Sequence, residues 1–249
     1  MRILCTNDDG YMARGLSVLA DAARVLGEVA IVAPDREQSA TSHSLTIHRP
    51  IRARKAQDGT HVVDGTPTDC VIMAVKEVLG YQPDFCLSGV NHGANMGEDV
   101  LYSGTVAAAM EATVIGIPSV ALSYTGDDFE RLDGWQPLLE KFLKQVLGRD
   151  SFPPNTLLNV NLPPLAPDEV KGVKVTSLGQ RKYSDSISRA LDPKGKEYFW
   201  IGGGISAWTG PDDADFRAVE EGFISVTPLH LDLTSYKTLE EIRGWHLAL

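Results

Sequence analysis

The order of the apolar segments limits most strongly what this chain can fold into. Residues 2–6 form a short apolar run without polar alternation, which is typical of a strand buried on both faces. Apolar residues then recur at helical spacing over 16–26, and residues 29–33 form a second buried run. Strand, helix and strand in this order predict a βαβ unit, and therefore parallel strands.

The same alternation continues to about residue 165, so we expect one doubly wound α/β domain. Its sheet should be mostly parallel and covered by helices on both faces, as a three-layer sandwich. After residue 170 the predicted strands are separated by polar segments rich in glycine and proline. We therefore divide the chain into an α/β core over 1–178 and a C-terminal part over 179–249. The latter should contain a protruding β-rich arm (179–215), a returning strand and a terminal helix; the resemblance described below implies that the core is catalytic and that the C-terminal part serves oligomerisation.

Composition and charge exclude several classes of protein. The 249 residues include 23 Lys and Arg and 33 Asp and Glu, a net charge of −10, which argues against polymeric nucleic acid or an anionic membrane as partner. The longest apolar stretches are far shorter than the ~20 residues that span a bilayer, and the N-terminus does not resemble a signal peptide. The three cysteines lack metal-site spacing, so we expect buried reduced thiols. A cytoplasmic protein without membrane contact is expected.

Two adjacent carboxylates, Asp8 and Asp9, follow the first predicted strand. At the mouth of a buried strand they repel each other and lose hydration, and a divalent cation would offset that cost. Neighbouring side chains in a strand point to opposite faces, so both reach one ion only if the backbone turns, which Gly10 permits. The alternative is that Asp9-Gly10 forms an ordinary turn and Asp8 caps a helix.

Two further oxygen donors, Ser39 and Asn91, are expected at the same edge of the sheet. Ser39 lies in a Ser- and Thr-rich loop or lid over 35–50, and Asn91 in the loop after a predicted strand over 84–88. Sites in open α/β sheets form outside the carboxyl ends of the strands, so both should lie near the two aspartates. Without this convergence, Ser39 would be one ordinary loop residue among several. The convergence predicts a metal site whose ligands come from three separate loops at the carboxyl edge of the sheet.

A site for an anion is predicted beside the metal site. Residues 89–97 read G-x-N-x-G-x-N-x-G, in which glycine lets a ligand approach the backbone and Asn95 offers amide donors. Ser103, Gly104 and Thr105 open an Ala-rich helix, whose N-terminal N–H groups and dipole attract phosphate. The simpler alternatives are a glycine-rich surface loop and an ordinary N-cap at Ser103.

Several motifs, in order along nearly the whole chain, resemble the stationary-phase survival protein SurE family. The matching stretches are MRIL (1–4), NDDG (7–10), APDR (33–36) with Ser39, GTPTDC (65–70), SGVNHGAN (88–95), YSGTV (102–106) and GFISVTPL (222–229). The resemblance implies a divalent-metal-dependent phosphomonoesterase that hydrolyses nucleoside monophosphates to nucleoside and phosphate, a 5′/3′-nucleotidase. Some members also cleave short polyphosphate. It further implies a homodimer or homotetramer in which the C-terminal arm is exchanged.

Residue roles are implied by position in these motifs. The resemblance assigns one Mg²⁺ or Mn²⁺ ion per subunit to four ligands, namely Asp8, Asp9, Ser39 and Asn91. It assigns the phosphate site to four residues, namely Asn95, Ser103, Gly104 and Thr105.

The chemistry implied by the resemblance is an in-line attack of water on phosphorus, with Asp8 and Asp9 as the catalytic residues. Aspartyl-phosphate enzymes space their two aspartates as D-x-D, whereas these two are adjacent, so we favour metal-activated water. One aspartate would then accept a proton, and His43 and His92 are candidate acids or phosphate donors. The alternative function is a nucleotide-binding regulatory module without hydrolysis. The first predicted strand is followed by NDDG and not by the GxGxxG motif of dinucleotide-binding proteins, which argues against a dinucleotide-dependent oxidoreductase.

Overall fold

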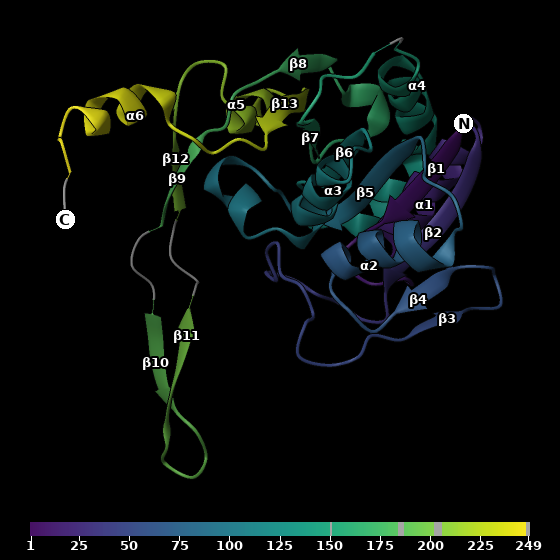
Figure 1. Ribbon diagram of the computed structural model, residues 1–249, viewed down its shortest axis with the longest axis horizontal. Coiled ribbons are helices and arrows are strands. Elements are labelled where there is room, and N and C mark those ends of the chain that lie inside the picture. The colour runs from purple at the N-terminus through teal and green to yellow at the C-terminus, as the bar shows by residue number, and fades with distance from the viewer. Residues whose placement is uncertain (150, 184–186, 202–205, 248–249) are drawn as a thin grey trace.

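The computed structural model describes residues 1–149, 151–183, 187–201 and 206–247 (Figure 1). Within them, one nine-stranded sheet has the order β3-β4-β2-β1-β5-β6-β7-β13-β8. Its strands are β1 (Arg2–Thr6), β2 (Glu28–Pro34), β3 (Ala53–Lys55), β4 (His61–Val63), β5 (Phe85–His92), β6 (Ser119–Tyr124), β7 (Thr156–Leu162), β8 (Val173–Val175) and β13 (Ile224–His230).

The sheet is mostly parallel, as expected. Neighbouring strands from β4 through β2, β1, β5 and β6 to β7 all run parallel. β3 pairs antiparallel with β4, and the returning strand β13 pairs antiparallel with β7. The chain passes from β1 to β2 on one side and later places β5 on the other side. Such a reversal opens a crevice at the carboxyl ends of β1 and β5, where ligands of this fold class bind.

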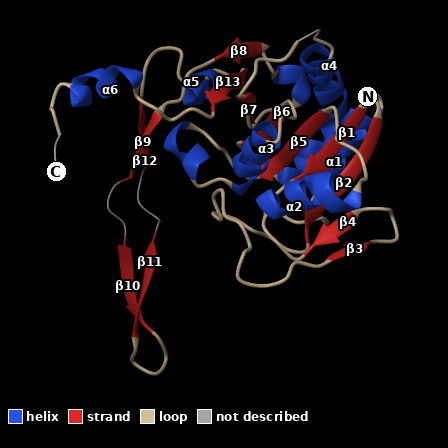
Figure 2. Ribbon diagram, viewed as in Figure 1, coloured by secondary structure: helices blue, strands red, loops and turns tan. Residues whose placement is uncertain are grey.

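Helices cover both faces of the sheet, which confirms the three-layer α/β architecture (Figure 2). The α-helices are α1 (Arg14–Arg24), α2 (Pro67–Met73), α3 (Gly104–Val114), α4 (Gln136–Leu147), α5 (Asp215–Glu220) and α6 (Tyr236–Arg243). α1 and α4 pack on one face, and α2 and α3 on the other. In β1, Ile3 and Cys5 contact the first layer and Leu4 the second, so the strand is buried on both sides. Each fully buried aliphatic side chain contributes roughly 1.5–3 kcal/mol.

Local signals explain several element boundaries. α2 begins at a capping box, because the Thr66 hydroxyl accepts from Asp69 N (3.1 Å) and the Asp69 carboxylate accepts from Thr66 N (2.8 Å). A π-helical turn, Ala74–Val78, continues it. A 3₁₀ turn, Phe129–Trp135, precedes α4, and Pro137 fits the first turn of the α-helix because the N–H that it lacks would have no acceptor within the helix. The other 3₁₀ turns are Gly97–Leu101 and Pro167–Glu169.

Two pairs of strands in the C-terminal part form an arm that projects from the body, whereas β13 returns to the main sheet (Figure 1). β9 (Gln180–Tyr183) pairs antiparallel with β12 (Ser206–Thr209), and β10 (Ile187–Leu191) with β11 (Glu197–Ile201). Trp200, on β11, is 68% exposed, whereas Trp135 is fully buried in the core. No described helix combines the length and the apolar character needed to cross a membrane.

Candidate functional site

The candidate site lies at the carboxyl ends of β1 and β5, where a tight turn follows β1. Asn7 Nδ2 donates to Gly10 O at 2.9 Å, and Gly10 has φ +96°, a conformation that glycine adopts easily. The turn brings Asp9 beside the end of β5, where its Oδ2 accepts from His92 N at 3.1 Å. Asp8 is only 4% exposed. The backbone therefore turns at Gly10, as a shared cation site requires.

Asp8 lies against the N-terminus of α3. Its Oδ2 accepts from Thr105 N at 3.0 Å, and its Oδ1 accepts from the Thr105 hydroxyl. A Cβ on Gly104 would lie 2.8 Å from the Asp8 Cβ, so only glycine allows this approach. Asp8 thus caps a helix, but the helix is α3, 97 residues further along the chain. Both polar groups of Thr105 are directed to Asp8, which makes Thr105 a residue that positions this carboxylate.

Burial controls the electrostatics of the aspartate pair. Burial raises the pKa of Asp8 to about 6. The charge of Asp9 acts in the same direction, whereas the hydrogen bonds from Thr105 favour the charged form and oppose the rise. Burial also raises the pKa of Asp9 to about 6, opposed by the His92 N–H and assisted by the charge of Glu37. Ionised carboxylates at such a site need a cation to offset lost hydration.

The described residues supply little positive charge to this pair. None of their Lys or Arg side chains forms an ion pair with either aspartate, and His92 Nδ1 lies 3.8 Å from Asp9 Oδ1. They also contain no group of three or more His, Cys, Asp or Glu side chains that could hold a metal ion. A hard cation here would be bound by the two carboxylates together with neutral oxygens, a donor set that suits Mg²⁺ or Mn²⁺. The residues present therefore fit such an ion.

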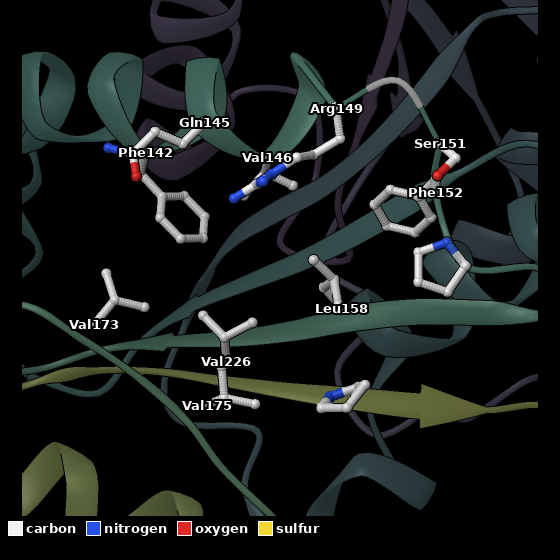
Figure 3. Close-up of a pocket in the computed structure, with 12 residues that line it drawn as sticks. Phe142, Gln145, Val146, Arg149, Ser151, Phe152, Leu158, Val173, Val175 and Val226 are labelled. Atoms are coloured by element: carbon white, nitrogen blue, oxygen red, sulfur yellow. The ribbon is translucent and has the colours of Figure 1, made fainter.

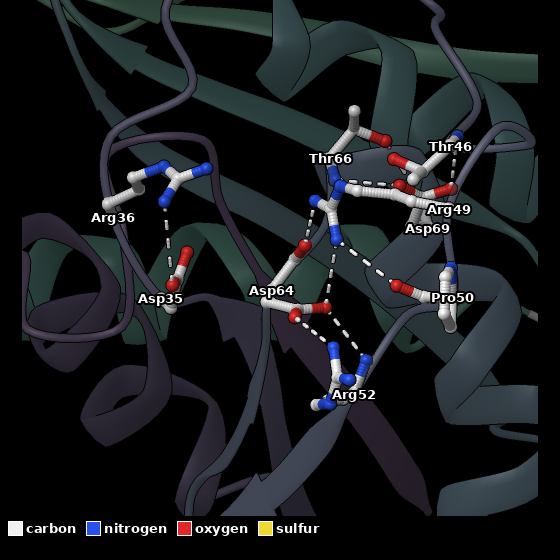
Figure 4. Close-up of polar contacts among 9 residues, drawn as sticks. All are labelled: Asp35, Arg36, Thr46, Arg49, Pro50, Arg52, Asp64, Thr66 and Asp69. Carbon is white, nitrogen blue, oxygen red and sulfur yellow. Dashed lines mark hydrogen bonds and ion pairs between the residues drawn. The ribbon is translucent and has the colours of Figure 1, made fainter.

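The 35–50 segment is irregular, as expected, and is tied down along its length. Ser42 N donates to Tyr102 O at 3.1 Å, and Thr46 N donates to Asp69 Oδ1 at 3.0 Å. Figure 4 shows the end of the segment, where Arg49 and Arg52 converge on Asp64. These contacts hold the segment as an ordered loop that runs from the start of α3 to the start of α2.

Ser39 lies in this loop beside the aspartates. The preceding residue, Gln38, donates its N–H to Asp8 O at 2.7 Å, which places Ser39 near the site. Its hydroxyl is exposed and donates to Glu37 Oε1 at 2.6 Å. Ala40 has φ +56°, which is strained for a residue with a Cβ, and such strain clusters at functional sites. Glu37 was not singled out in the sequence, because nothing local distinguishes it from other surface glutamates.

Asn91 differs from the sequence prediction in its secondary structure. We expected it in a loop after residue 88, but β5 continues to His92, with an irregularity in its pairing with β6 between Ser88 and Asn91. Asn91 Nδ2 donates to Gly93 O at 2.8 Å, so Oδ1 is the atom suited to a cation. The histidine beside it stacks on Phe129, with ring centroids 4.2 Å apart.

Asn95 is buried and fixes the glycine-rich loop to the sheet. Its Nδ2 donates to Ser123 Oγ at 2.8 Å, and its N donates to Asn161 Oδ1 at 2.9 Å. Its carbonyl oxygen accepts from Asn159 Nδ2 (2.7 Å) and Asn161 Nδ2 (2.9 Å). These contacts anchor the loop on β6 and β7, and a role of Asn95 toward phosphate stays a prediction.

Asp215, which the sequence analysis missed, holds the same loop from the other side. This buried carboxylate accepts from Gly97 N (2.9 Å), Gly179 N (2.9 Å) and Phe216 N (2.8 Å). It therefore links the glycine-rich loop to the base of the arm and to α5. Burial raises its pKa, and the three N–H donors oppose that rise.

The remaining candidates divide between the site and the surface. Ser103 is the N-cap of α3, since its Oγ accepts from Val106 N at 3.0 Å. The N–H of Gly104 sits in the first turn, where the helix itself provides no acceptor, so it is suited to an anion. His43 instead pairs with Glu111 at 2.9 Å along α3. The structure thus brings Asp8, Asp9 and the α3 N-terminus together, with Ser39 and Asn91 at the rim.

A separate apolar cavity of about 350 Å³ lies far from this site (Figure 3). Phe142 and Val146 of α4 face Leu158 of β7 across it, and Phe152 closes one end. Leu158 lies near the start of β7, at the amino edge of the parallel sheet. This cavity gathers no cluster of oxygen donors and is not the candidate site.

Comparison with known proteins agrees with this geometry. A family model described as "Survival protein SurE" matches residues 3–185. The "5'-nucleotidase SurE" of Gemmatimonas aurantiaca is 55% identical over 248 residues, 98% of each chain, and that of Syntrophotalea carbinolica is 45% identical over all of this chain and 98% of its own. The crystal structure of the SurE protein from Aquifex aeolicus superposes with a TM-score of 0.86 at 40% identity, covering 99% of this chain and 100% of that one. The expected family is thereby confirmed, and the chain belongs to the SurE family.

Proposed function

We propose that this chain is a 5′-nucleotidase, a phosphoric monoester hydrolase that converts nucleoside monophosphates to nucleoside and phosphate with the help of a divalent metal ion. The observation that carries the metal requirement is the pair of adjacent carboxylates. Asp8 is buried against the N-terminus of α3, Asp9 accepts from His92 N, and no Lys or Arg among the described residues forms an ion pair with either. Full-length relatives named 5'-nucleotidase support the activity.

The proposed metal ligands are Asp8, Asp9, Ser39 and Asn91, which would hold one Mg²⁺ or Mn²⁺ ion per subunit. When bound, a divalent cation neutralises charge on a phosphate oxygen and lowers the pKa of a coordinated water. Ser39 would have to turn its hydroxyl from Glu37 toward the site, a rotation about a single bond that its exposed position permits.

The phosphate would rest against the start of α3. The N–H of Gly104 and the helix dipole favour its charge, and the hydroxyl of Ser103 and the amide of Asn95 lie on the connections around it. Thr105 would contribute indirectly, by holding Asp8 in place. One aspartate would accept a proton from the attacking water. His92, whose backbone N–H donates to Asp9, is one candidate for the acid that protonates the leaving group.

We also propose further substrates, an oligomeric state and a cellular location for the protein. Activity on 3′-nucleotides and short polyphosphate would use the same phosphate site. A homodimer or homotetramer is supported by exposed apolar side chains on the arm and after α6, including Trp200 and Trp245. Three buried free thiols suit a reducing compartment, so we place the protein in the cytoplasm.

Phosphate release from AMP tests the proposal. Purified protein should release phosphate with Mn²⁺ or Mg²⁺, lose this activity in EDTA, and regain it when metal is restored. Asp8→Asn should lose most turnover while remaining folded. Release that is insensitive to EDTA, or wild-type turnover in this variant, would refute the assignment. Tight AMP binding without release would favour the non-hydrolytic module.

A further inference from the structure

An apolar groove lies beside α4, where the sheet extends beyond its helical cover. Val175 of β8 lies opposite Val226 of β13 in the parallel pairing, so both side chains point to the same face of the sheet. Val226 is buried in the core layer that α4 covers. Val175, by contrast, is 77% exposed, and Val173, two residues earlier on the same face, is 52% exposed. The uncovered end of the sheet forms the floor of the groove, and α4 forms its wall.

Two adjacent cavities follow this groove. The larger, about 350 Å³, is the cavity of Figure 3, in which Phe142 and Val146 of α4 face Leu158 of β7. The smaller, about 220 Å³, shares Phe142, Gln145 and Val173 with it. The larger cavity alone is within the range of about 300–1,000 Å³ that is typical of small-molecule sites. The groove therefore has room for an elongated apolar ligand between α4 and β8.

The groove is positively charged, unlike the chain as a whole. Arg149 lines the larger cavity, Lys141 and Lys171 line the smaller one, and no described Asp or Glu lines either. The chain, by contrast, carries 33 acidic and 23 basic residues. None of the three cations forms an ion pair with a described residue. Apolar surface beside uncompensated positive charge suits a ligand that has an apolar chain and an anionic head.

The groove is separate from the proposed active site and from the arm. Leu158 lies near the start of β7, at the amino edge of the parallel sheet, whereas Asp8 and Asp9 follow the carboxyl end of β1. In Figure 1, α4 and β8 belong to the body, and the hairpin of β10 and β11 projects away from them. The catalytic chemistry and the subunit contacts proposed above therefore do not require this surface.

We propose that the groove binds a fatty acid, with the carboxylate at Arg149 and the alkyl chain against Val146, Leu158 and Val226. Arg149 lies three residues after Val146, and Figure 3 shows its side chain extending toward that residue. A guanidinium can donate two parallel hydrogen bonds to a carboxylate. Burial of each CH₂ group of the chain adds to the affinity. This site is independent of the nucleotidase function proposed above.

Calorimetry with the full-length protein and monomeric fatty acids tests the ligand class. Hexanoate, octanoate and decanoate should bind with a Kd that falls about fourfold for each added CH₂, because the chain is buried. Decyltrimethylammonium has a similar tail and a cationic head. It should bind at least about tenfold more weakly than decanoate, because the groove is lined by cations and by no described acid.

Two variants test the location of the site. Arg149→Gln should raise the decanoate Kd at least about tenfold, because the carboxylate loses its charged partner. Lys144→Gln is the control, since Lys144 belongs to the same helix but lines neither cavity. Val173→Glu adds an acid where the two cavities meet, at a side chain exposed enough to fold normally, and should also raise the Kd at least about tenfold. Val25→Glu, at an exposed valine after α1, should bind as wild type does.

The other outcomes would each overturn the proposal. Decanoate binding that neither Arg149→Gln nor Val173→Glu weakens would place the ligand elsewhere on the protein. Equal binding of decanoate and decyltrimethylammonium would show that the charge of the groove selects nothing. Absence of decanoate binding, together with a lower molar mass of Val173→Glu in light scattering, would assign the groove to a contact with a second copy of the chain. Co-sedimentation with phosphatidylglycerol vesicles, without binding of monomeric decanoate, would assign it to a lipid surface.

Discussion

Replacing Asp8 by Asn should stabilise the metal-free protein at neutral pH, although it removes a proposed metal ligand. Asp8 is 4% exposed, and burial raises its pKa from 3.8 to about 6. The folded protein therefore binds this proton more tightly than the unfolded chain does. The stabilisation from proton binding is fully present below pH 3.8 and is lost as the pH rises through about 6. At pH 7.5 the ionised carboxylate destabilises the fold.

The size of the effect follows from the pKa. Since one pKa unit corresponds to about 1.4 kcal/mol, a rise from 3.8 to about 6 corresponds to about 3 kcal/mol. Asn is nearly isosteric with Asp and can keep both contacts with Thr105: its oxygen accepts from the N–H, and the Thr105 hydroxyl can rotate to accept from the new NH₂. We therefore expect the variant to gain about 2–3 kcal/mol in free energy of unfolding.

Urea unfolding in EDTA, at intervals between pH 4 and 8, measures this gain. The wild type should lose stability relative to Asp8→Asn as the pH rises through about 6. Asp21→Asn, which changes an exposed carboxylate of α1, should shift the free energy of unfolding by less than about 0.5 kcal/mol. Added Mn²⁺ should stabilise the wild type much more than Asp8→Asn. A variant that is less stable than the wild type in EDTA at pH 7.5 would refute the reasoning.

Further predictions concern the supports of the site. Gly104→Ala would place a Cβ 2.8 Å from the Cβ of Asp8, so kcat for AMP should fall at least about tenfold. Gly134→Ala is the control and should retain activity, because its Cβ would meet no atom closer than 3.7 Å. Asp215→Ala leaves three backbone N–H groups without their acceptor, so the free energy of unfolding measured in urea should fall by at least about 3 kcal/mol. Asp215→Asn keeps one acceptor oxygen, so its free energy of unfolding should fall by less. Trp200→Ser should weaken subunit association in light-scattering measurements, and an unchanged molar mass at all concentrations would count against the proposed role of the arm.

Much of the fold could be predicted because its signals are local. The buried run of β1, the turn at Gly10 and the capping box at Thr66 each depend on a few adjacent residues. Since the carboxyl ends of parallel strands lie at one edge of the sheet, the sequence placed Asp8, Asp9 and Asn91 at that edge, and the order of the strands, which it did not predict, puts β5 next to β1.

Other features depend on contacts between distant residues and could not be predicted. Asp215 accepts from Gly97, 118 residues away, and nothing near Asp215 in the sequence indicates this contact. Thr105 looked like a phosphate donor because it opens a helix, but the fold directs it to Asp8. β5 runs past Gly89 to include Asn91, because pairing with β6 resumes after an irregularity that the glycine-rich sequence does not reveal.

Anomalous diffraction from crystals soaked in manganese tests the metal site most directly. We predict a manganese peak bonded to the carboxylates of Asp8 and Asp9, with Ser39 Oγ and Asn91 Oδ1 among its other ligands. The same peak should be absent from crystals of Asp8→Asn. Wild-type crystals that diffract well yet show no peak between β1 and β5, or that hold manganese only elsewhere, would contradict the proposed site.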